Sequence, residues 1–599
     1  AGSGVSIGAV SGLGPDELAA LQEKWFVFAL MWSVCASATT HGRKLLSVFI
    51  TEIEAQFPPA GTCFDYYVDN KMGDWQPWAE RLAVNPWRPP PRASFHRLIV
   101  PTVDSMRNQF VVDVLVRSAT NVLVTGQTGT GKTVLVEQLL DTLPSSHTKL
   151  VINFSSATAA HTVQEIIEGS MEKRSATKLA PVGGKKLVLF LDDLNMPRKD
   201  AYGSQPPLEL IRQFADYGCW YDRKKQTIRI IKDMQLMAAM GPPGGGRSEI
   251  SQRLQSRFHL INFTPPSDGQ LRHIFESILA PRMVDFDDEA KSLLPNIVLS
   301  TVQLYNHMTE KFLPTPEKSH YLFNLRDISR VVQGMLEARP KFIADREAML
   351  RLWCHECLRV FADRLVTPED ADKFRNAISE RLQRNFDSRW DALMRTCPDP
   401  KVGPVFADCL SAPESEADVT GPYEEVQDLR KLREALMGRL EDYNMERGFV
   451  PMNLVMFKDA MQHLARISRV LRQPRANMML VGVGGSGRRS LTRLASYVAE
   501  CTVFTIEITK TYRLGEFRQD LGELYRMAGL RGKRMVFLFS DTEIKEEGFL
   551  EDINNMLSIG IVPNLFDKDT LPEIYDAMRA VAKAENVQQT PDKLWELFL

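Results

Sequence analysis

The sequence predicts an α/β fold built as a tandem: two sheet domains in succession, each belonging with an all-helical domain. Short apolar segments alternate with amphipathic segments from about residue 94 to residue 265, which is typical of a sheet covered by helices. A second block with the same alternation begins near Met452. Both blocks carry a glycine-rich loop directly after an apolar segment, and the two loops align when Lys132 is matched to Arg488.

Composition and punctuation predict four parts. These are a largely helical leading segment, 1–92, an α/β domain, 93–267, an all-helical domain, 268–442, and a second α/β domain, 443–599. Prolines 89–91 close the first part, and the polar stretch 397–422 indicates an exposed connection. The second α/β block stops before it has supplied the strands of the first, so we expect a fragment of a larger protein.

The expected strands are short apolar runs bounded by turn residues. In the leading segment we expect helical structure from residue 15 to about residue 57 and a strand at 64–69. The strands of the two blocks are predicted at 122–124, 150–154, 187–191 and 235–240, and then at 478–481, 503–506 and 535–539.

Charge and cysteine usage exclude several classes of protein. The net charge of −2 shows no basic excess, so we expect no nucleic-acid partner. The longest apolar run, Trp25 to Ala38, is shorter than the about 20 residues that cross a bilayer, so we expect no membrane span. The eight cysteines form no disulfide framework, which favours a reducing cytoplasm. Cys354 and Cys357 lie in an amphipathic segment and predict core packing rather than a zinc site.

A complete phosphate-binding loop, the Walker A pattern, follows the strand expected at 122–124. Its residues are Gly126, Gln127, Thr128, Gly129, Thr130, Gly131, Lys132 and Thr133. We expect the backbone N–H groups to face the phosphates, Lys132 to reach the terminal phosphates and Thr133 to hold Mg²⁺. The alternative is a plain glycine-rich turn, which the strand before the loop and the helix after it disfavour.

A carboxylate pair, Asp192 and Asp193, ends the strand expected at 187–191. We expect Asp192 to position Mg²⁺. Asp193 stands where ATPases of this class place the glutamate that orients or deprotonates the attacking water, and it is one methylene shorter. The alternative is a capping device for the following turn.

Two arginines complete the first site as we expect it. Arg326 opens a helix in the all-helical domain and would bridge to the γ-phosphate. Arg253 lies where such a module offers an arginine to its neighbour, with Arg257 as the alternate. Each of them alone would be a solvated surface charge.

The second loop keeps the glycines of the pattern and loses its chemistry. It comprises Gly482, Gly484, Gly485, Ser486, Gly487, Arg488, Arg489 and Ser490, with Asp541 and Thr542 after the strand expected at 535–539. Arg488 replaces the lysine, and Arg489 takes the Ser/Thr position. Thr542 stands in the place of the catalytic carboxylate and cannot act as a base. We expect this site to bind nucleotide with little or no hydrolysis.

At these residues the chain resembles the axonemal dynein heavy chain, over the third and fourth P-loop AAA+ modules of its motor ring. The sequence motifs that carry the resemblance most specifically are 188–197, 202–213, 241–247, 318–327, 480–487 and 549–557. These motifs resemble the single-headed inner-arm type more than the outer-arm type. The leading segment resembles the helical lid of the second module. Gly241 departs from the pattern, since active AAA+ sites keep a sensor asparagine there, and so does Arg488, where part of the family keeps lysine.

The resemblance implies a minus-end-directed microtubule motor of cilia and flagella, in the cytoskeleton and the axoneme. Its implied cofactors are ATP or ADP and Mg²⁺. Its implied partners are the remaining AAA+ modules of the same chain, microtubules reached through a stalk, and dynein intermediate and light chains. In this family the third module gates stepping, so we expect an ATP-binding regulatory segment.

Two alternatives remain open at this point. In the first, both modules hold nucleotide permanently as a structural ligand. In the second, the chain belongs to a dynein-related remodelling ATPase. Hydrolysis at an AAA+ site needs an arginine from the adjacent module, so we expect the isolated segment to be nearly inactive.

Overall fold

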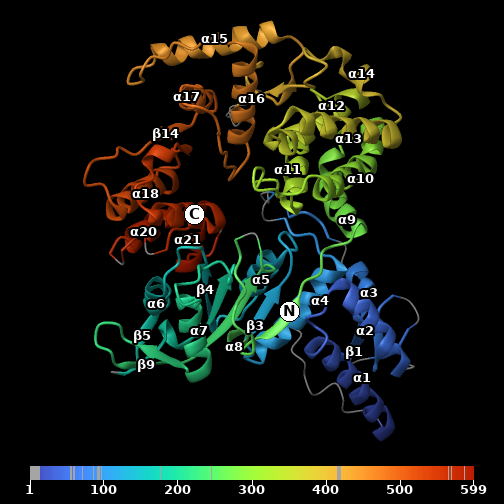
Figure 1. The fold of residues 1–599 in the computed structure, drawn as a ribbon, viewed down its shortest axis with the longest axis vertical. Coiled ribbons are helices and arrows are strands. Elements are labelled where there is room, and N and C mark those ends of the chain that lie inside the picture. The colour runs from blue at the N-terminus through green and yellow to red at the C-terminus, as the bar shows by residue number, and fades with distance from the viewer. Residues whose placement is uncertain are drawn as a thin grey trace. The chain divides into compact units, whose positions relative to one another are not determined.

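The computed structural model describes residues 14–599, apart from residues 54–56, 59–60, 70–71, 85–86, 91–94, 96–97, 176, 245, 344, 414–419, 564, 568 and 586. The boundary expected at 92–93 therefore lies outside the described residues. The chain divides into two compact units, one of residues 1–88 with 99–270 and one of residues 89–98 with 271–599 (Figure 1). Among the described residues no helix is long and apolar enough to span a bilayer.

A five-stranded parallel sheet forms the centre of the first unit, in the order β11-β3-β10-β7-β4 (Figure 1). The strands are β3 (Val122–Thr125), β4 (His147–Asn153), β7 (Lys186–Asp192), β10 (Met234–Met240) and β11 (His259–Asn262). The four strands expected from the sequence in this block are confirmed. The sequence reasoning missed β11, whose short run His-Leu-Ile-Asn has polar ends.

Each face of this sheet is covered by different helices, and alternate strand residues point to opposite faces. Val122, Val124, Phe190 and Ala239 pack with α4 (Val103–Arg117), α5 (Lys132–Asp141) and the leading segment. Their neighbours along the strands pack with α6 (Ala160–Gly169), α7 (Pro206–Tyr217) and α8 (Gln252–Gln255). Burial on both faces explains why the central strands read as continuous apolar runs rather than alternating ones.

A second, smaller sheet in this unit was not expected. Its order is β5-β6-β9-β8, and its strands are β5 (Met171–Lys173), β6 (Lys178–Pro181), β8 (Cys219–Tyr221) and β9 (Ile228–Ile231). Each strand is three or four residues long, and all but β8 carry a charged residue, so no long apolar run marks them.

The leading segment forms α1 (Pro15–Ser33), α2 (Thr40–Ile53), the antiparallel pair β1 (Tyr66–Asp69) and β2 (Asp74–Pro77), and α3 (Trp78–Val84). The helical periodicity expected over 15–57 is confirmed as two helices, which turns at 34–39 divide. The strand expected at 64–69 is confirmed for its last four residues.

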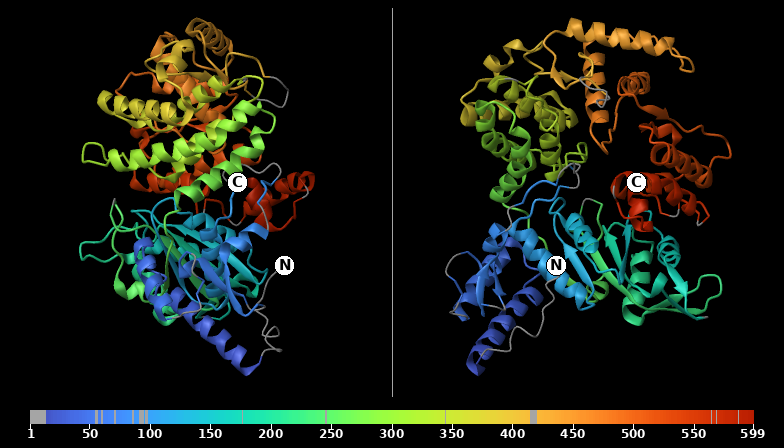
Figure 2. Two further views of the ribbon diagram at one scale, coloured as in Figure 1. Left: turned by 90° about the vertical axis from the view of Figure 1, so that its right-hand side faces the viewer. Right: turned by 180° about the vertical axis from the view of Figure 1, so that it is seen from behind.

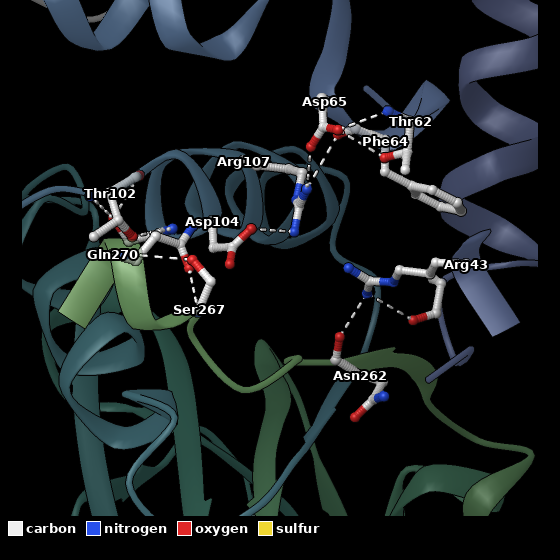
Figure 3. Close-up of polar contacts among 12 residues, drawn as sticks. Arg43, Thr62, Phe64, Asp65, Thr102, Asp104, Arg107, Asn262, Ser267 and Gln270 are labelled. Atoms are coloured by element: carbon white, nitrogen blue, oxygen red, sulfur yellow. Dashed lines mark hydrogen bonds and ion pairs between the residues drawn. The ribbon is translucent and has the colours of Figure 1, made fainter. Parts of the chain in front are cut away.

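Hydrogen bonds tie the leading segment to the edge strand β11 and to α4 (Figure 3). The Arg43 Nη2 donates to the Asn262 carbonyl at 2.6 Å, and the Asn262 N–H donates to the Ala36 carbonyl at 2.9 Å. Arg107 of α4 donates to the Asp65 carboxylate at 3.4 Å and to Asp104. The edge of the sheet beyond β11 is thus covered by chain from outside the α/β domain, which protects unpaired edge groups.

In the second unit, helices from 268 to 393 form the all-helical domain (Figure 2, green to yellow). They are α9 (Asp268–Leu279), α10 (Asp288–Lys311), α11 (Leu325–Met335), α12 (Arg346–Val360), α13 (Pro368–Phe386) and α14 (Trp390–Leu393). Cys354 and Cys357 are fully buried in α12, so they pack in the core as expected. The connection expected at 397–422 contains β12 (Phe406–Ala407), which pairs with β13 (Glu424–Glu425).

The second α/β block is built mainly from helices in the described residues. They are α15 (Leu429–Met445), α16 (Lys458–Arg472), α17 (Arg488–Val498), α18 (Leu514–Gly529), α19 (Glu547–Ile559), α20 (Leu571–Ala584) and α21 (Pro591–Phe598). Two short parallel strands, β14 (Thr502–Phe504) and β15 (Met535–Phe537), confirm two of the three expected strands.

The strand expected at 478–481 is not formed. Met479 and Val481 are each 87% exposed, and Val483 is 80% exposed. In the first block the equivalent strand β3 lies between β10 and β11, which both follow β7 in the sequence. After β15 the described residues 541–598 form helices and connections, so 478–481 has no strand on either side to pair with. An apolar run specifies a strand only where partners exist.

A buried ion pair joins the all-helical domain to the second block. The Glu356 carboxylate on α12 is fully buried and accepts from the guanidinium of Arg469 on α16, with Nε 3.0 Å from Oε2. The Tyr423 hydroxyl donates to the same carboxylate at 2.9 Å. A Cβ on Gly334 of α11 would stand 1.8 Å from this carboxylate, so the glycine leaves the space that the ion pair needs.

We expect Arg469→Met to destabilise the α12–α16 contact by about 3–5 kcal/mol, because Glu356 would stay buried without its partner. The double variant Glu356→Gln with Arg469→Met should recover most of that loss. Native-state hydrogen exchange of the amides in α12 and α16 measures the change. The exposed pair Arg579–Asp576 is the matched control, and its removal should cost under about 1 kcal/mol. Equal losses for the two pairs would contradict the assignment.

Candidate functional site

The first phosphate-binding loop joins β3 to α5 and depends on glycine. Gly131 precedes α5 with φ +79°, in the left-handed region that other residues rarely adopt. A Cβ on Gly126 would lie 2.6 Å from the carbonyl oxygen of Phe263, at the end of β11. The loop therefore curls tightly at the carboxyl end of the central strand, where its N–H groups and the amino end of α5 form an anion-binding cradle.

Lys132 lies over this loop. Its Nζ donates to the carbonyls of Gly126 at 3.0 Å and Gln127 at 2.8 Å. These bonds hold the ammonium at the mouth of the loop. From there we expect it to reach the terminal phosphates.

Thr133 and Asp192 meet across the site, as the sequence expects for two metal-binding residues. The Thr133 hydroxyl donates to the Asp192 Oδ2 at 2.7 Å. Burial raises the pKa of the Asp192 carboxyl, the Thr133 hydrogen bond opposes that effect, and the neighbouring Asp193 adds to it. A hydroxyl and a buried carboxylate side by side are oxygen ligands of the kind that Mg²⁺ prefers, so these residues fit that cation.

Asp193, the expected catalytic carboxylate, adopts a left-handed backbone with φ +51°. Aspartate tolerates this region better than most residues, and unusual backbone conformations of this kind cluster at functional sites. Its Oδ1 lies 3.6 Å from the Arg247 Nη2, so the two side chains form an ion pair.

Sequence reasoning missed Arg247 as a site residue. A Cβ on Gly241 would stand 3.0 Å from the Arg247 Nε and 3.1 Å from its Cδ. Gly241 occupies the place of the sensor asparagine, and the side chain of Arg247 lies over it. The turn that returns Arg247 is closed by hydrogen bonds between Gly244 and Arg247, and Asn195 Nδ2 anchors the Gly241 carbonyl at 2.9 Å. The sequence did contain a signal for this arrangement: a glycine at 241, where a side chain is usual, is followed by a glycine-rich turn and then by Arg247.

The other expected arginines do not gather at Asp193 within the first unit. Arg253 is exposed on α8, where its carbonyl accepts from the Ser256 hydroxyl at 2.9 Å, and its alternate Arg257 pairs with Asp216 at 2.5 Å. Arg326 is exposed at the first turn of α11, in the second unit. The roles of Arg253 and Arg326 stay predictions.

The second loop, residues 482–487, repeats the backbone of the first one. Gly485 and Gly487 have φ +80° and +77°, against +90° and +79° at Gly129 and Gly131. The Ser486 N–H donates to the Val483 carbonyl at 3.4 Å, as Thr130 does to Gln127 at the same distance.

The side chains of the second loop differ from those of the first. The Arg488 Nη2 approaches the Val483 carbonyl at 3.5 Å, in the manner of Lys132. The Arg489 guanidinium donates to the hydroxyls of Ser540 and Thr542, the latter at 3.3 Å, and to the Glu543 Oε1 at 3.0 Å. Asp541 and Thr542 are exposed in the short helix after the strand, and Ser490 lies one residue beyond the loop's Ser/Thr position.

Family models match most of the chain. Residues 87–266 match the P-loop containing dynein motor region, and residues 452–599 match the P-loop containing dynein motor region D4. Residues 274–371 match the dynein heavy chain ATPase lid domain, and residues 6–80 match the dynein heavy chain AAA lid domain.

Curated relatives agree with these matches. Dynein axonemal heavy chain 2 of Mus musculus is 47% identical over 96% of this chain and 13% of its own length. Dynein-1-beta heavy chain, flagellar inner arm I1 complex, of Chlamydomonas reinhardtii is 45% identical over 97% of this chain and 13% of its own length. Dynein axonemal heavy chain 6 of Homo sapiens is 38% identical over 96% of this chain and 14% of its own length. The chain spans about an eighth of the length of these relatives, and it belongs to the dynein heavy chain family, whose P-loop AAA+ modules and lid domains it carries.

Proposed function

We propose that this chain is an ATP-binding regulatory segment of an axonemal dynein motor, with one Mg·ATP site and one site that holds nucleotide without turnover. The observation that carries the proposal is the first site: a glycine loop on the central strand with Lys132, Thr133 and Asp192 already in contact around it. The second loop supports the other half, because it keeps the cradle and loses the catalytic carboxylate.

At the first site each residue has a separate task. The loop N–H groups and Lys132 bind the phosphates, and Thr133 with Asp192 would hold Mg²⁺, which supplies charge neutralisation on the phosphate oxygens. Burial disfavours the charged form of the Asp192 carboxyl, and a cation beside it would stabilise that charged form. Asp193 would orient the attacking water or accept its proton.

Arg247 would replace the missing sensor asparagine. Its ion pair with Asp193 orients the carboxylate, and the space that Gly241 leaves allows the guanidinium to lie beside it. The same ion pair occupies the carboxylate with a fixed partner, which would slow its part in activating water. The arrangement supports slow hydrolysis, as a gating module needs.

The wider assignment rests on the relatives. The matching names are axonemal, and one of them is an inner-arm chain. Residues 452–599 match the D4 region, which supports our proposal that residues 87–266 before it are the third module. We infer a place in the axoneme of cilia or flagella, and as partners the other AAA+ modules, microtubules through a stalk, and dynein intermediate and light chains. The single-headed type stays a prediction. Permanently bound structural nucleotide is the competing function, and conversion of bound ATP to ADP would exclude it at the first site.

Lys132→Ala should weaken nucleotide binding at the first site by more than about tenfold, because the phosphates lose their direct ammonium partner. Calorimetric titration of the chain with Mg·ADP measures the affinity and the number of sites. Lys225→Ala, on an exposed loop of the same unit, is the matched control and should change neither. An unchanged affinity in Lys132→Ala would refute the site.

Arg247→Ala should slow the conversion of bound ATP to ADP by about tenfold, because Asp193 loses the partner that orients it. Nucleotide affinity should stay within about twofold, since Arg247 makes no contact with the loop. The fraction of bound ADP after gel filtration measures conversion, and Arg247→Lys should recover part of it. Arg174→Ala removes an exposed ion pair as the control. A parallel loss of affinity and conversion would indicate a merely structural arginine.

Asp541→Ala in the complete heavy chain should leave basal ATPase activity almost unchanged, because Thr542 provides no carboxylate to activate water. Steady-state phosphate release measures the rate, with Asp192→Ala in parallel as the variant of a competent site. A loss of about tenfold for Asp541→Ala, some 1.4 kcal/mol of barrier, would show that the second site hydrolyses.

A further inference from the structure

The position that holds Mg²⁺ in the first site carries an arginine in the second. Thr133 and Arg489 are both the second residue of the helix after the loop, in α5 and in α17. The glycines before the two helices have similar φ angles, +79° at Gly131 and +77° at Gly487, so the two side chains follow the same local turn. The difference between the sites is therefore one of side-chain chemistry at this position.

Arginine cannot do what the threonine does. A threonine hydroxyl offers oxygen lone pairs to a cation, whereas a guanidinium has five N–H donors and no acceptor. It also remains positively charged at any physiological pH, so it repels a divalent cation. The residues of the second site therefore do not fit Mg²⁺ as those of the first site do.

The Arg489 guanidinium lies where the first site has its Thr133–Asp192 contact. It donates to Ser540 and Thr542, the residues on either side of Asp541, and to Glu543. Glu543 is 12% exposed in its side chain, and its other oxygen accepts from the Ser540 N–H at 2.8 Å, which holds the carboxylate in place. The Arg489 side chain is 54% exposed, and its Nη2 lies within hydrogen-bond distance of all three partners. The oxygens beside Asp541 are thus already bound to a protein cation.

We propose that Arg489 takes the place of Mg²⁺ at the second site, so that this site binds metal-free nucleotide. The inference rests on the proposed nucleotide binding at residues 482–490. Arg488 and Arg489 together supply two positive charges at the loop, and a guanidinium pairs with phosphate oxygens through two parallel hydrogen bonds. The ligand is a nucleoside di- or triphosphate whose phosphates meet arginine rather than a cation, and its binding is insensitive to removal of divalent ions.

The test is photoaffinity labelling of the complete heavy chain with azido-ATP, in Mg²⁺ or in EDTA, followed by mapping of labelled peptides. In EDTA the label on residues 452–599 should stay within about twofold, while the label on residues 87–266 should fall by about tenfold or more. The first site is thus an internal control in the same molecule.

Arg489→Thr recreates the side chain of the first site, and its label on 452–599 should become sensitive to EDTA. Arg489→Lys keeps a cation and should remain insensitive. Arg579→Thr, on an exposed position of α20, is the matched control and should behave as the unaltered chain.

Each of the other outcomes contradicts either the inference about Mg²⁺ or the proposed nucleotide binding at the second site. If the label on 452–599 falls with that on 87–266 in the unaltered chain, the second site needs Mg²⁺ and the inference is wrong, while nucleotide binding there stands. If Arg489→Thr stays insensitive to EDTA, Arg489 is not the substitute cation. If 452–599 takes no label with or without Mg²⁺, the proposed binding at the second site fails, and the inference fails with it.

Discussion

The pairing of one strand on both sides sets the geometry of the first site. Thr125, the last residue of β3, pairs with Met240 of β10 and with Asn262 of β11, so the chain is held immediately before Gly126. The next residue after β11 brings the carbonyl that forbids a side chain at Gly126. β10 also pairs with β7, whose end carries Asp192. The loop, the carboxylates and the Gly241 turn therefore all extend from adjacent strand ends, where open parallel sheets bind their ligands.

Much of this arrangement was predictable from the sequence, because it is encoded locally. Continuous apolar runs marked the buried strands, and the glycine spacing marked both loops. The short sheet β5-β6-β9-β8 was not predictable, since most of its strands carry charges and all depend on their neighbours. Arg247 was missed because its role comes from a space left by Gly241, six residues away, and from a turn that no pattern of side chains reveals. The strand expected at 478–481 failed for the complementary reason: its apolar run is present, but no strand among the described residues pairs with it.

The two loops separate the contribution of the backbone from that of the side chains. The φ angles of Gly129 and Gly485 are +90° and +80°, those of Gly131 and Gly487 are +79° and +77°, and the same loop hydrogen bond closes both loops. The peptide N–H groups of a phosphate cradle are therefore retained where the metal ligand and the catalytic carboxylate are not. A cradle made of main chain tolerates loss of its side-chain chemistry, whereas hydrolysis needs both. Binding and turnover can diverge within one chain without a change of fold.

The open stretch at 478–483 has a practical consequence for handling the chain. A run of exposed methionine and valine outside any sheet is a template for pairing with another copy. Purified by itself, this polypeptide should self-associate as its concentration rises, and dilute or mildly chaotropic buffers should keep it dispersed. Charged residues placed at 479 and 481 would improve its solubility without touching the phosphate cradle of the first module.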